Sequence, residues 1–145
     1  MQVTARTDYG LRIMIFVASK GEALSTIAEI AAAYQISKSH LMKIVRELVA
    51  KGYLRAVRGK HGGIRIGKPA EQIRMGQIVR DLEPDFGLVE CLRTNNSCVI
   101  TPVCLLRNAL LKALDAFLKS LDEHTLADVV SNAAPIKRLL SIRQD

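Results

Sequence analysis

The chain has 145 residues, enough for one domain with a substantial hydrophobic core. Trp is absent and aromatic residues make up only 4%, so the core must consist mainly of aliphatic side chains, which argues for packed helices against a β-sandwich or barrel. The net charge is +7, and the excess lies in residues 1–70, which hold 12 Lys or Arg and 4 Asp or Glu. Such asymmetry favours a polyanionic partner, most commonly nucleic acid.

The first predicted helix spans residues 7–20, where apolar residues recur at helical spacing, and Gly21 ends it. The apolar run at residues 11–19 is interrupted by Arg12 and follows an acidic residue, so it predicts a buried helix and no signal peptide. Ser25 is predicted to cap a second helix. The inner face of that helix would carry Ile27, Ile30 and Ala31.

A third helix is predicted to begin after Ser37 and to end at Gly52. Two short helices joined by a turn of a few residues, the second with a polar exposed face, are typical of a helix-turn-helix. Side chains near the start of the second helix would reach base edges, and cations one turn later would meet phosphates. The predicted DNA-contacting residues of this helix are Ser37, Lys38, Ser39, His40, Lys43 and Arg46.

Residues 53–57 and 63–66 alternate in character as strands do, and a glycine-rich basic turn joins them. Directly after a helix-turn-helix, this hairpin predicts a wing that enters a minor groove or grips the DNA backbone. The turn lacks the Lys-Ser/Thr ending and the following helix of a P-loop, which excludes nucleotide binding there. The wing residues predicted to contact DNA are Arg58, Lys60, His61 and Arg65.

The remaining chain predicts a short helix over residues 75–82, a loop, a long helix and a final segment. Thr101 and Pro102 would open the long helix, whose apolar stripe is longer than a small domain requires and favours a partner helix. That stripe consists of Val103, Leu106, Leu110, Ala113, Phe117 and Leu121.

Thr125 would cap the final segment. The expected organisation is a winged helix-turn-helix DNA-binding domain (1–82), a cysteine loop (83–104), a dimerisation helix (102–123) and a C-terminal segment (124–145). The fold class is therefore mainly α with a small β-wing.

The three cysteines of the chain, Cys91, Cys98 and Cys104, all fall in or beside this loop. An odd number of cysteines argues against a closed disulfide framework. The chain has no apolar run long enough to span a membrane, so the protein is expected to be cytoplasmic with reduced thiols. Gaps of six and five residues are looser than the tight pairs of most zinc sites and suit a loop around an iron–sulfur cluster. Cys104 would lie in the first turn of the long helix, where the helix dipole favours a thiolate. A cluster, a zinc ion and redox-active or inert thiols all remain open on spacing alone.

An enzyme is not expected, because His40, His61 and His124 lie on three different predicted elements and form no catalytic group with carboxylates. A zinc- or thiol-based transcription regulator would share the DNA-binding half. An iron–sulfur scaffold or electron carrier would not need the basic wing.

Several sequence motifs, which together cover essentially the whole chain, resemble those of the winged-helix iron–sulfur repressors. They are residues 7–12 (TDYGLR), the wing at 57–63 (VRGKHGG), residues 79–83 (VRDLE) and the cysteine loop followed by a long helix. Residues 100–104 (ITPVC) and 83–84 (EP) are similar to the members of that family that sense nitric oxide.

The resemblance implies a homodimeric repressor that binds a near-palindromic operator and responds to nitric oxide, controlling nitric-oxide stress genes. It implies that Cys91, Cys98 and Cys104 ligate a [4Fe-4S] cluster, with [2Fe-2S] as the alternative, and that Asp8 from the partner subunit is the fourth ligand. The iron–sulfur-assembly regulators of the family use a His three residues past the last Cys, where this chain has Arg107. A regulator that responds to cluster or redox state remains the alternative.

Overall fold

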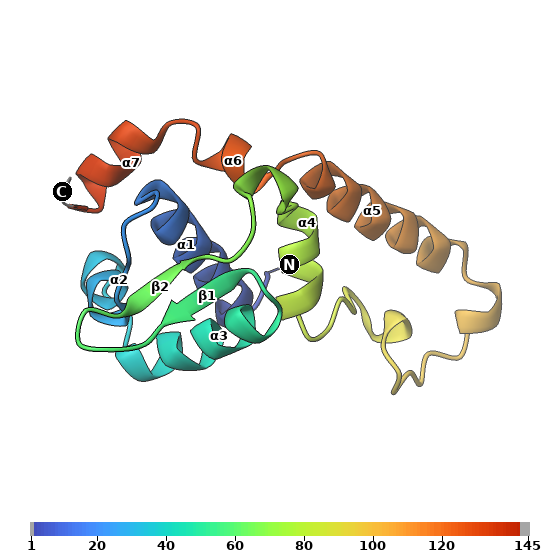
Figure 1. Ribbon diagram of the computed structural model, residues 1–145. Coiled ribbons are helices and arrows are strands. Elements are labelled where there is room, and N and C mark those ends of the chain that lie inside the picture. The colour runs from blue at the N-terminus through green and yellow to red at the C-terminus, as the bar shows by residue number, and fades with distance from the viewer. Residues whose placement is uncertain (1, 143–145) are drawn as a thin grey trace.

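The computed structural model describes residues 2–142, so residues 143–145 at the end of the predicted C-terminal segment lie outside it. A compact body at the amino-terminal side carries one long helix and a loop that extend away from it (Figure 1). The fold is mainly α with one two-stranded antiparallel sheet, as predicted. The elements are α1 (Ala5–Ser19), α2 (Ile27–Tyr34), α3 (Lys38–Ala50), β1 (Leu54–Val57), β2 (Gly63–Ile66), the 3₁₀ turn η1 (Ala70–Gln72), α4 (Met75–Leu82), the 3₁₀ turns η2 (Glu90–Leu92) and η3 (Thr101–Val103), α5 (Leu105–Asp122), α6 (Leu126–Val129) and α7 (Ala133–Leu139).

Helix α1 runs through the middle of the body and packs against α3, α4 and the wing. Its buried side chains are joined in one core by apolar residues of the other helices and of both strands. At Gly10 the α4 helix comes so close that an added Cβ would collide with Leu82. The core members of α1 are Ile13, Met14, Phe16 and Val17.

The starts of the first two helices differ from the prediction. Helix α1 begins at Ala5 because Thr4 caps it, and the Thr7 hydroxyl donates to Glu83 Oε2 at 2.7 Å, which ties this end to the end of α4. The predicted Ser25 cap of α2 is wrong: Thr26 is the N-cap and forms a capping box with Glu29. Ser25 is instead buried and exchanges backbone hydrogen bonds with Ile64, which extends the wing pairing.

The helix-turn-helix and the wing match their predictions. Gln35 closes α2 in the left-handed conformation with φ of 54°, and the Ser37 hydroxyl accepts from the amide of His40 at 3.4 Å to cap α3. In the wing, Leu54 pairs with Ile66 and Ala56 with Ile64. Gly62 is required at the tip because a Cβ there would collide with the carbonyl oxygen of Val57.

The predicted start of the long helix at Thr101 is wrong. Residues 101–103 form η3, and α5 begins only after Cys104, which occupies the N-cap position. Thr101 does not cap α5, because its hydroxyl donates to the carbonyl of Cys98 at 2.7 Å and accepts from Asn96 at 2.8 Å. The hydroxyl is therefore used to stabilise the cysteine loop.

The chain returns to the body after α5. Arg80 of α4 forms a bidentate ion pair with Asp122, with both N–O distances at 2.7 Å, and this fastens the end of α5. Thr125 caps α6 as predicted and forms a capping box with Asp128. The amide of Leu126 donates to the carbonyl of Ile73 at 2.8 Å, which attaches this segment to the body. Within residues 2–142 no helix is both long and apolar enough to span a membrane.

Candidate nucleic-acid interface and cysteine loop

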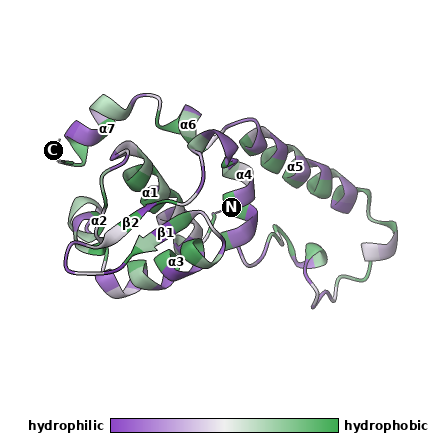
Figure 2. Ribbon diagram, in the orientation of Figure 1, coloured by the Kyte–Doolittle hydropathy of each residue, from purple (hydrophilic) through white to green (hydrophobic). Residues whose placement is uncertain are grey.

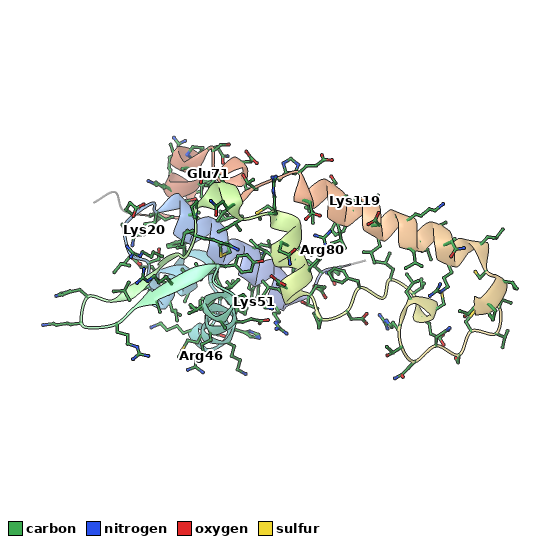
Figure 3. All side chains as sticks on the ribbon, turned by 45° about the vertical axis from the view of Figure 1, so that its right-hand side comes forward. Lys20, Arg46, Lys51, Glu71, Arg80 and Lys119 are labelled. Carbon is green, nitrogen blue, oxygen red and sulfur yellow. The ribbon has the colours of Figure 1, made fainter. Side chains whose placement is uncertain are left out.

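Helix α3 has one buried face and one exposed polar face. Leu41, Ile44 and Leu48 are in the core, whereas the predicted DNA-contacting residues at 38–40, 43 and 46 are all exposed. Arg46 lies on the outer side of the helix (Figure 3). The Ser37 hydroxyl is used as the helix cap, so its role at this surface is to fix the start of the helix that carries the others.

Within residues 2–142, ion pairing neutralises several cations of this half of the chain but none of the predicted DNA-contacting cations. Arg6 pairs with Glu47 and Lys51 with Asp81, which neutralises cations beside α3. Within residues 2–142, the predicted contact cations have no carboxylate within ion-pair distance. These unpaired cations are Lys38, Lys43, Arg46, Arg58, Lys60 and Arg65. Their charge is therefore available to an external anion.

The wing contributes one cation that the sequence prediction missed. Arg55 of β1 lies directly opposite Arg65 of β2 in the register, so the two arginines share the outer face of the hairpin. Like charges opposite each other destabilise an isolated sheet, and a phosphate between them would relieve that cost. The alternation of residues 54–57 indicated an outward side chain at this position, but the pairing partner was not readable from it. Arg58, Lys60 and His61 are exposed at and beside the tip.

A chain of contacts links Asp8 of α1 to the start of α3. Arg12 binds the Asp8 carboxylate through two nitrogens, at 2.8 and 3.1 Å. The same guanidinium lies 5.8 Å from the ring centres of both Tyr9 and Tyr34. Tyr9 makes an edge-to-face contact with His40 at 5.9 Å. Burial raises the pKa of the Tyr34 hydroxyl, and the charge of Arg12 opposes that effect.

The three cysteines are free, and each lies at a different point of the loop. Cys91 is half-buried in η2, Cys98 is exposed, and Cys104 is half-buried at the N-cap of α5. Within residues 2–142 no three His, Cys, Asp or Glu side chains gather closely enough to hold a metal ion. A single chain therefore neither closes the cysteines around a common centre nor adds Asp8 to them.

Polar side chains organise the backbone around each predicted ligand. Glu90 accepts hydrogen bonds from the amide and hydroxyl of Ser97, at 2.8 and 2.6 Å, and so joins the residues that precede Cys91 and Cys98. These two hydrogen bonds, from the hydroxyl first and then the amide, hold the pKa of Glu90 below its usual value. The Asn96 carboxamide oxygen accepts from the amide of Cys98 at 2.9 Å.

The three cysteine thiols are chemically suited to bind an iron–sulfur cluster. Three unpaired thiols on one polar, irregular loop are soft ligands of the kind that bind zinc or iron–sulfur clusters. Arg107 stands three residues past Cys104 and cannot act as a ligand, because a guanidinium stays protonated. A fourth ligand must come from elsewhere.

Comparisons with known proteins agree with this architecture. The family model described as "Rrf2: Iron-dependent Transcriptional regulator" matches residues 3–132. The HTH-type transcriptional regulator NsrR of Bacillus licheniformis is 47% identical over 143 residues, covering 97% of this chain and 100% of the relative. Among solved structures, CymR, the global cysteine regulator of B. subtilis, is 30% identical with a TM-score of 0.74, covering 91% of this chain and 98% of that one. T. potens IscR shares the fold at a TM-score of 0.74 and 24% identity, covering 100% of this chain and 94% of that one.

Proposed function

Because the chain belongs to the Rrf2 family of iron-dependent transcriptional regulators, we propose that it is a homodimeric repressor that senses nitric oxide through an iron–sulfur cluster. The kinship with NsrR that residues 83–84 and 100–104 indicated is confirmed, and the relatives are regulators, not enzymes. The observation that carries the proposal is a loop of three free thiols joined to a surface of unpaired cations on α3 and the wing. The proposed targets are genes that protect against nitric-oxide stress.

The exposure of side chains along α5 supports dimerisation through this helix. It has 18 residues, and none of them is buried against the rest of the chain. Leu106 is 65% exposed and Phe117 is 39% exposed, while Leu110 and Leu121 of the predicted stripe are half-buried. Figure 2 shows green and purple alternating along α5, as in a helix with an apolar stripe. We propose that the α5 helices of two copies pair along this stripe.

Such a dimer would present two recognition helices to DNA. Helix α3 of each copy would enter a major groove, at half-sites about 34 Å or slightly more apart, and each wing would contact the adjacent backbone or minor groove. A two-fold dimer matches a near-palindromic operator. The unpaired cations would supply phosphate contacts, while Ser39 and His40 would reach base edges.

Cys91, Cys98 and Cys104 would hold the cluster, and Asp8 of the partner subunit would be the fourth ligand. When bound, a [4Fe-4S] cluster would supply an iron that a carboxylate leaves more open to a diatomic gas than a fourth thiolate would; [2Fe-2S] is the alternative. Asp8 has two competing partners in this scheme. In the single chain its carboxylate is held by Arg12, and ligation across the dimer would require it to leave that guanidinium.

The contacts of Arg12 provide a route from Asp8 to the DNA-reading surface. Moving Asp8 changes the charge that Arg12 faces, and Arg12 lies against the ring of Tyr9, which contacts His40 on α3. We propose that ligation of Asp8 favours the DNA-binding arrangement of the two recognition helices and that its release favours the other. This is a two-state coupling in which both the cluster and the operator bind the same state more tightly.

The decisive experiment is anaerobic purification followed by absorption spectroscopy and metal analysis, before and after titration with nitric oxide. Operator binding is measured in parallel by gel shift at several salt concentrations. The proposal expects a coloured, iron-containing dimer whose spectrum and operator affinity both change with nitric oxide. Colourless protein with zinc would indicate a zinc regulator, and metal-free protein a thiol-based one. A response to oxidants but not to nitric oxide would indicate the alternative regulator of cluster or redox state.

Substitution Asp8→Ala tests the fourth ligand. We expect the cluster-free variant to remain folded and dimeric, because Asp8 is partly exposed and its loss breaks only a surface ion pair. The ratio of operator affinities with and without the cluster should fall by about 10-fold, the lower end of effects at metal-site residues. The matched control is Glu22→Ala, which removes an exposed carboxylate just beyond α1. An Asp8→Ala protein with an unchanged spectrum and nitric-oxide response would contradict the cross-subunit ligand.

A further inference from the structure

Arg107 holds the backbone of one predicted ligand segment against the helix that carries another. Its Nε donates to the carbonyl oxygen of Cys91 at 3.1 Å. Within residues 2–142 this is the one hydrogen bond between α5 and residues 83–100. Cys91 lies in η2 and Cys104 is the N-cap of α5, so this bond joins the two elements that present these thiols.

The position of Arg107 in α5 is unfavourable for the helix itself. It is the third residue of the helix, where backbone amides point outward and a positive charge opposes the helix dipole. The first turn of α5 has no acidic residue, and Cys104 makes no side-chain cap. Helix stability alone therefore favours a carboxylate here, whereas a neighbouring group of thiolates favours a cation.

The other polar contacts of the loop leave this role to Arg107. Asn96 and Thr101 hold the amide and the carbonyl of Cys98, and Glu90 joins the residues that precede Cys91 and Cys98. These contacts all lie within residues 90–101. None of them connects the loop to α5, so without Arg107 the packing of η2 against α5 would have no hydrogen bond in the described chain to fix it.

We infer that Arg107 is a positioning residue of the cysteine site: it sets the distance between the Cys91 segment and Cys104 and places a fixed cation beside the anionic ligand set. Only the second part of this inference, the cation beside the ligand set, rests on the proposed iron–sulfur function. The contact itself belongs to the chain without any cofactor, which allows the two to be tested separately.

The test uses Arg107→Ala and Arg107→Lys in the full-length protein. Amide hydrogen exchange over residues 88–98 is measured in the cluster-free protein, and the rate of iron loss to a chelator is measured in the anaerobically loaded dimer. Circular dichroism verifies that α5 remains helical. Lys112→Ala is the matched control, because Lys112 is an exposed cation on the same helix.

For Arg107→Ala we expect faster exchange over residues 88–98 and iron loss faster by about 10-fold, as for other residues that orient metal ligands. Arg107→Lys keeps the charge but not the guanidinium geometry, so it should fall between the wild type and Arg107→Ala. The control should match the wild type. Unchanged exchange and iron loss in Arg107→Ala, or an equal effect of Lys112→Ala, would overturn the inference. If the wild-type protein holds no iron, the proposed function fails, while the exchange measurement still decides whether Arg107 positions the loop.

Discussion

At the scale of single residues, the distribution of carboxylates decides which cations are available to DNA. Arg6 and Lys51 lie beside α3, yet each is paired with an acidic residue. Lys43 and Arg46 lie on α3 itself and have no carboxylate within ion-pair distance in the described chain. The total positive charge of this half of the chain therefore overstates the number of cations that are available to DNA. We propose that the unpaired cations on α3 and the wing form the DNA-binding surface.

Arg46→Ala should weaken operator binding by about 10-fold, because one charge-assisted contact to a phosphate contributes about 1.5 kcal/mol. The slope of log affinity against log salt should become shallower by about 0.9. Fluorescence anisotropy with an operator duplex at several salt concentrations measures both quantities. Lys119→Ala is the control, since Lys119 lies on α5 at a distance from α3 (Figure 3). An unchanged salt slope in Arg46→Ala would mean that Arg46 contacts no phosphate.

At the scale of elements, α5 is a helix whose apolar residues exceed what its own chain buries. Leu114 and Leu118 are half-buried, while Leu105 is 82% exposed and Leu106 is 65% exposed. An isolated helix of this length is marginal in water, so tertiary or partner contacts must stabilise it. Within the described residues the Arg80–Asp122 ion pair fastens the end of α5 to the body, and Arg107 near its start contacts the cysteine loop. One side of the helix, which includes Leu105 and Leu106, stays exposed in the single chain and could face a second copy.

Leu106→Glu should disrupt the proposed dimer, because it would place an unpaired carboxylate in an apolar interface. The expected cost is about 3 kcal/mol or more, which raises the dimer Kd by over about 100-fold. Sedimentation velocity over a concentration series measures this change. Lys112→Glu is the control, about 120° away around the helix. A Leu106→Glu protein that remains dimeric at wild-type concentrations would exclude the stripe as the interface.

At the scale of the whole molecule, a polar joint holds α5 and the C-terminal segment to the winged-helix body. Hydrogen bonding from Arg80 across this joint lowers the pKa of Asp122. Within the C-terminal segment, the amide and hydroxyl of Thr125 lower the pKa of Asp128. Both carboxylates are more acidic in the folded chain than their ordinary value of 3.8. Their contribution to stability is therefore complete well above that value and is lost as the pH falls through the lowered folded pKa.

The free energy of unfolding should accordingly stay level from neutral pH down to about pH 5 and fall as the pH drops below about 4. Asp122→Asn should be less stable at neutral pH and should show a shallower acid decline, because one carboxylate with a lowered pKa has been removed. Urea unfolding between pH 3 and pH 7 tests both. Asp115→Asn is the control, because within the described residues Asp115 forms its ion pair with Lys119 on the same helix and not with the body. Identical acid declines for the wild type and Asp122→Asn would show that this joint does not set the acid stability.

Much of the fold could be predicted because it depends on neighbours three or four residues apart. The caps at Ser37 and Thr125, the wing strands and α4 all follow from local spacing and were located correctly. The errors occurred where a tertiary contact changed the role of a local signal. Ser25 pairs with Ile64 and so does not cap α2, and Thr101 bonds to the cysteine loop and so does not cap α5. The ligand roles of the cysteines and Asp8 remain predictions.

By itself, the sequence determined the class of this protein: a basic winged helix, a three-cysteine loop and an apolar helix with more hydrophobic surface than one chain needs. Only the tertiary structure decided which charges are neutralised and which side chains organise the loop. Arg6 meets Glu47 across 41 residues, and Thr7 meets Glu83 across 76. Short-range periodicity carries no information about such partners, because they meet only after the helices have packed around the core.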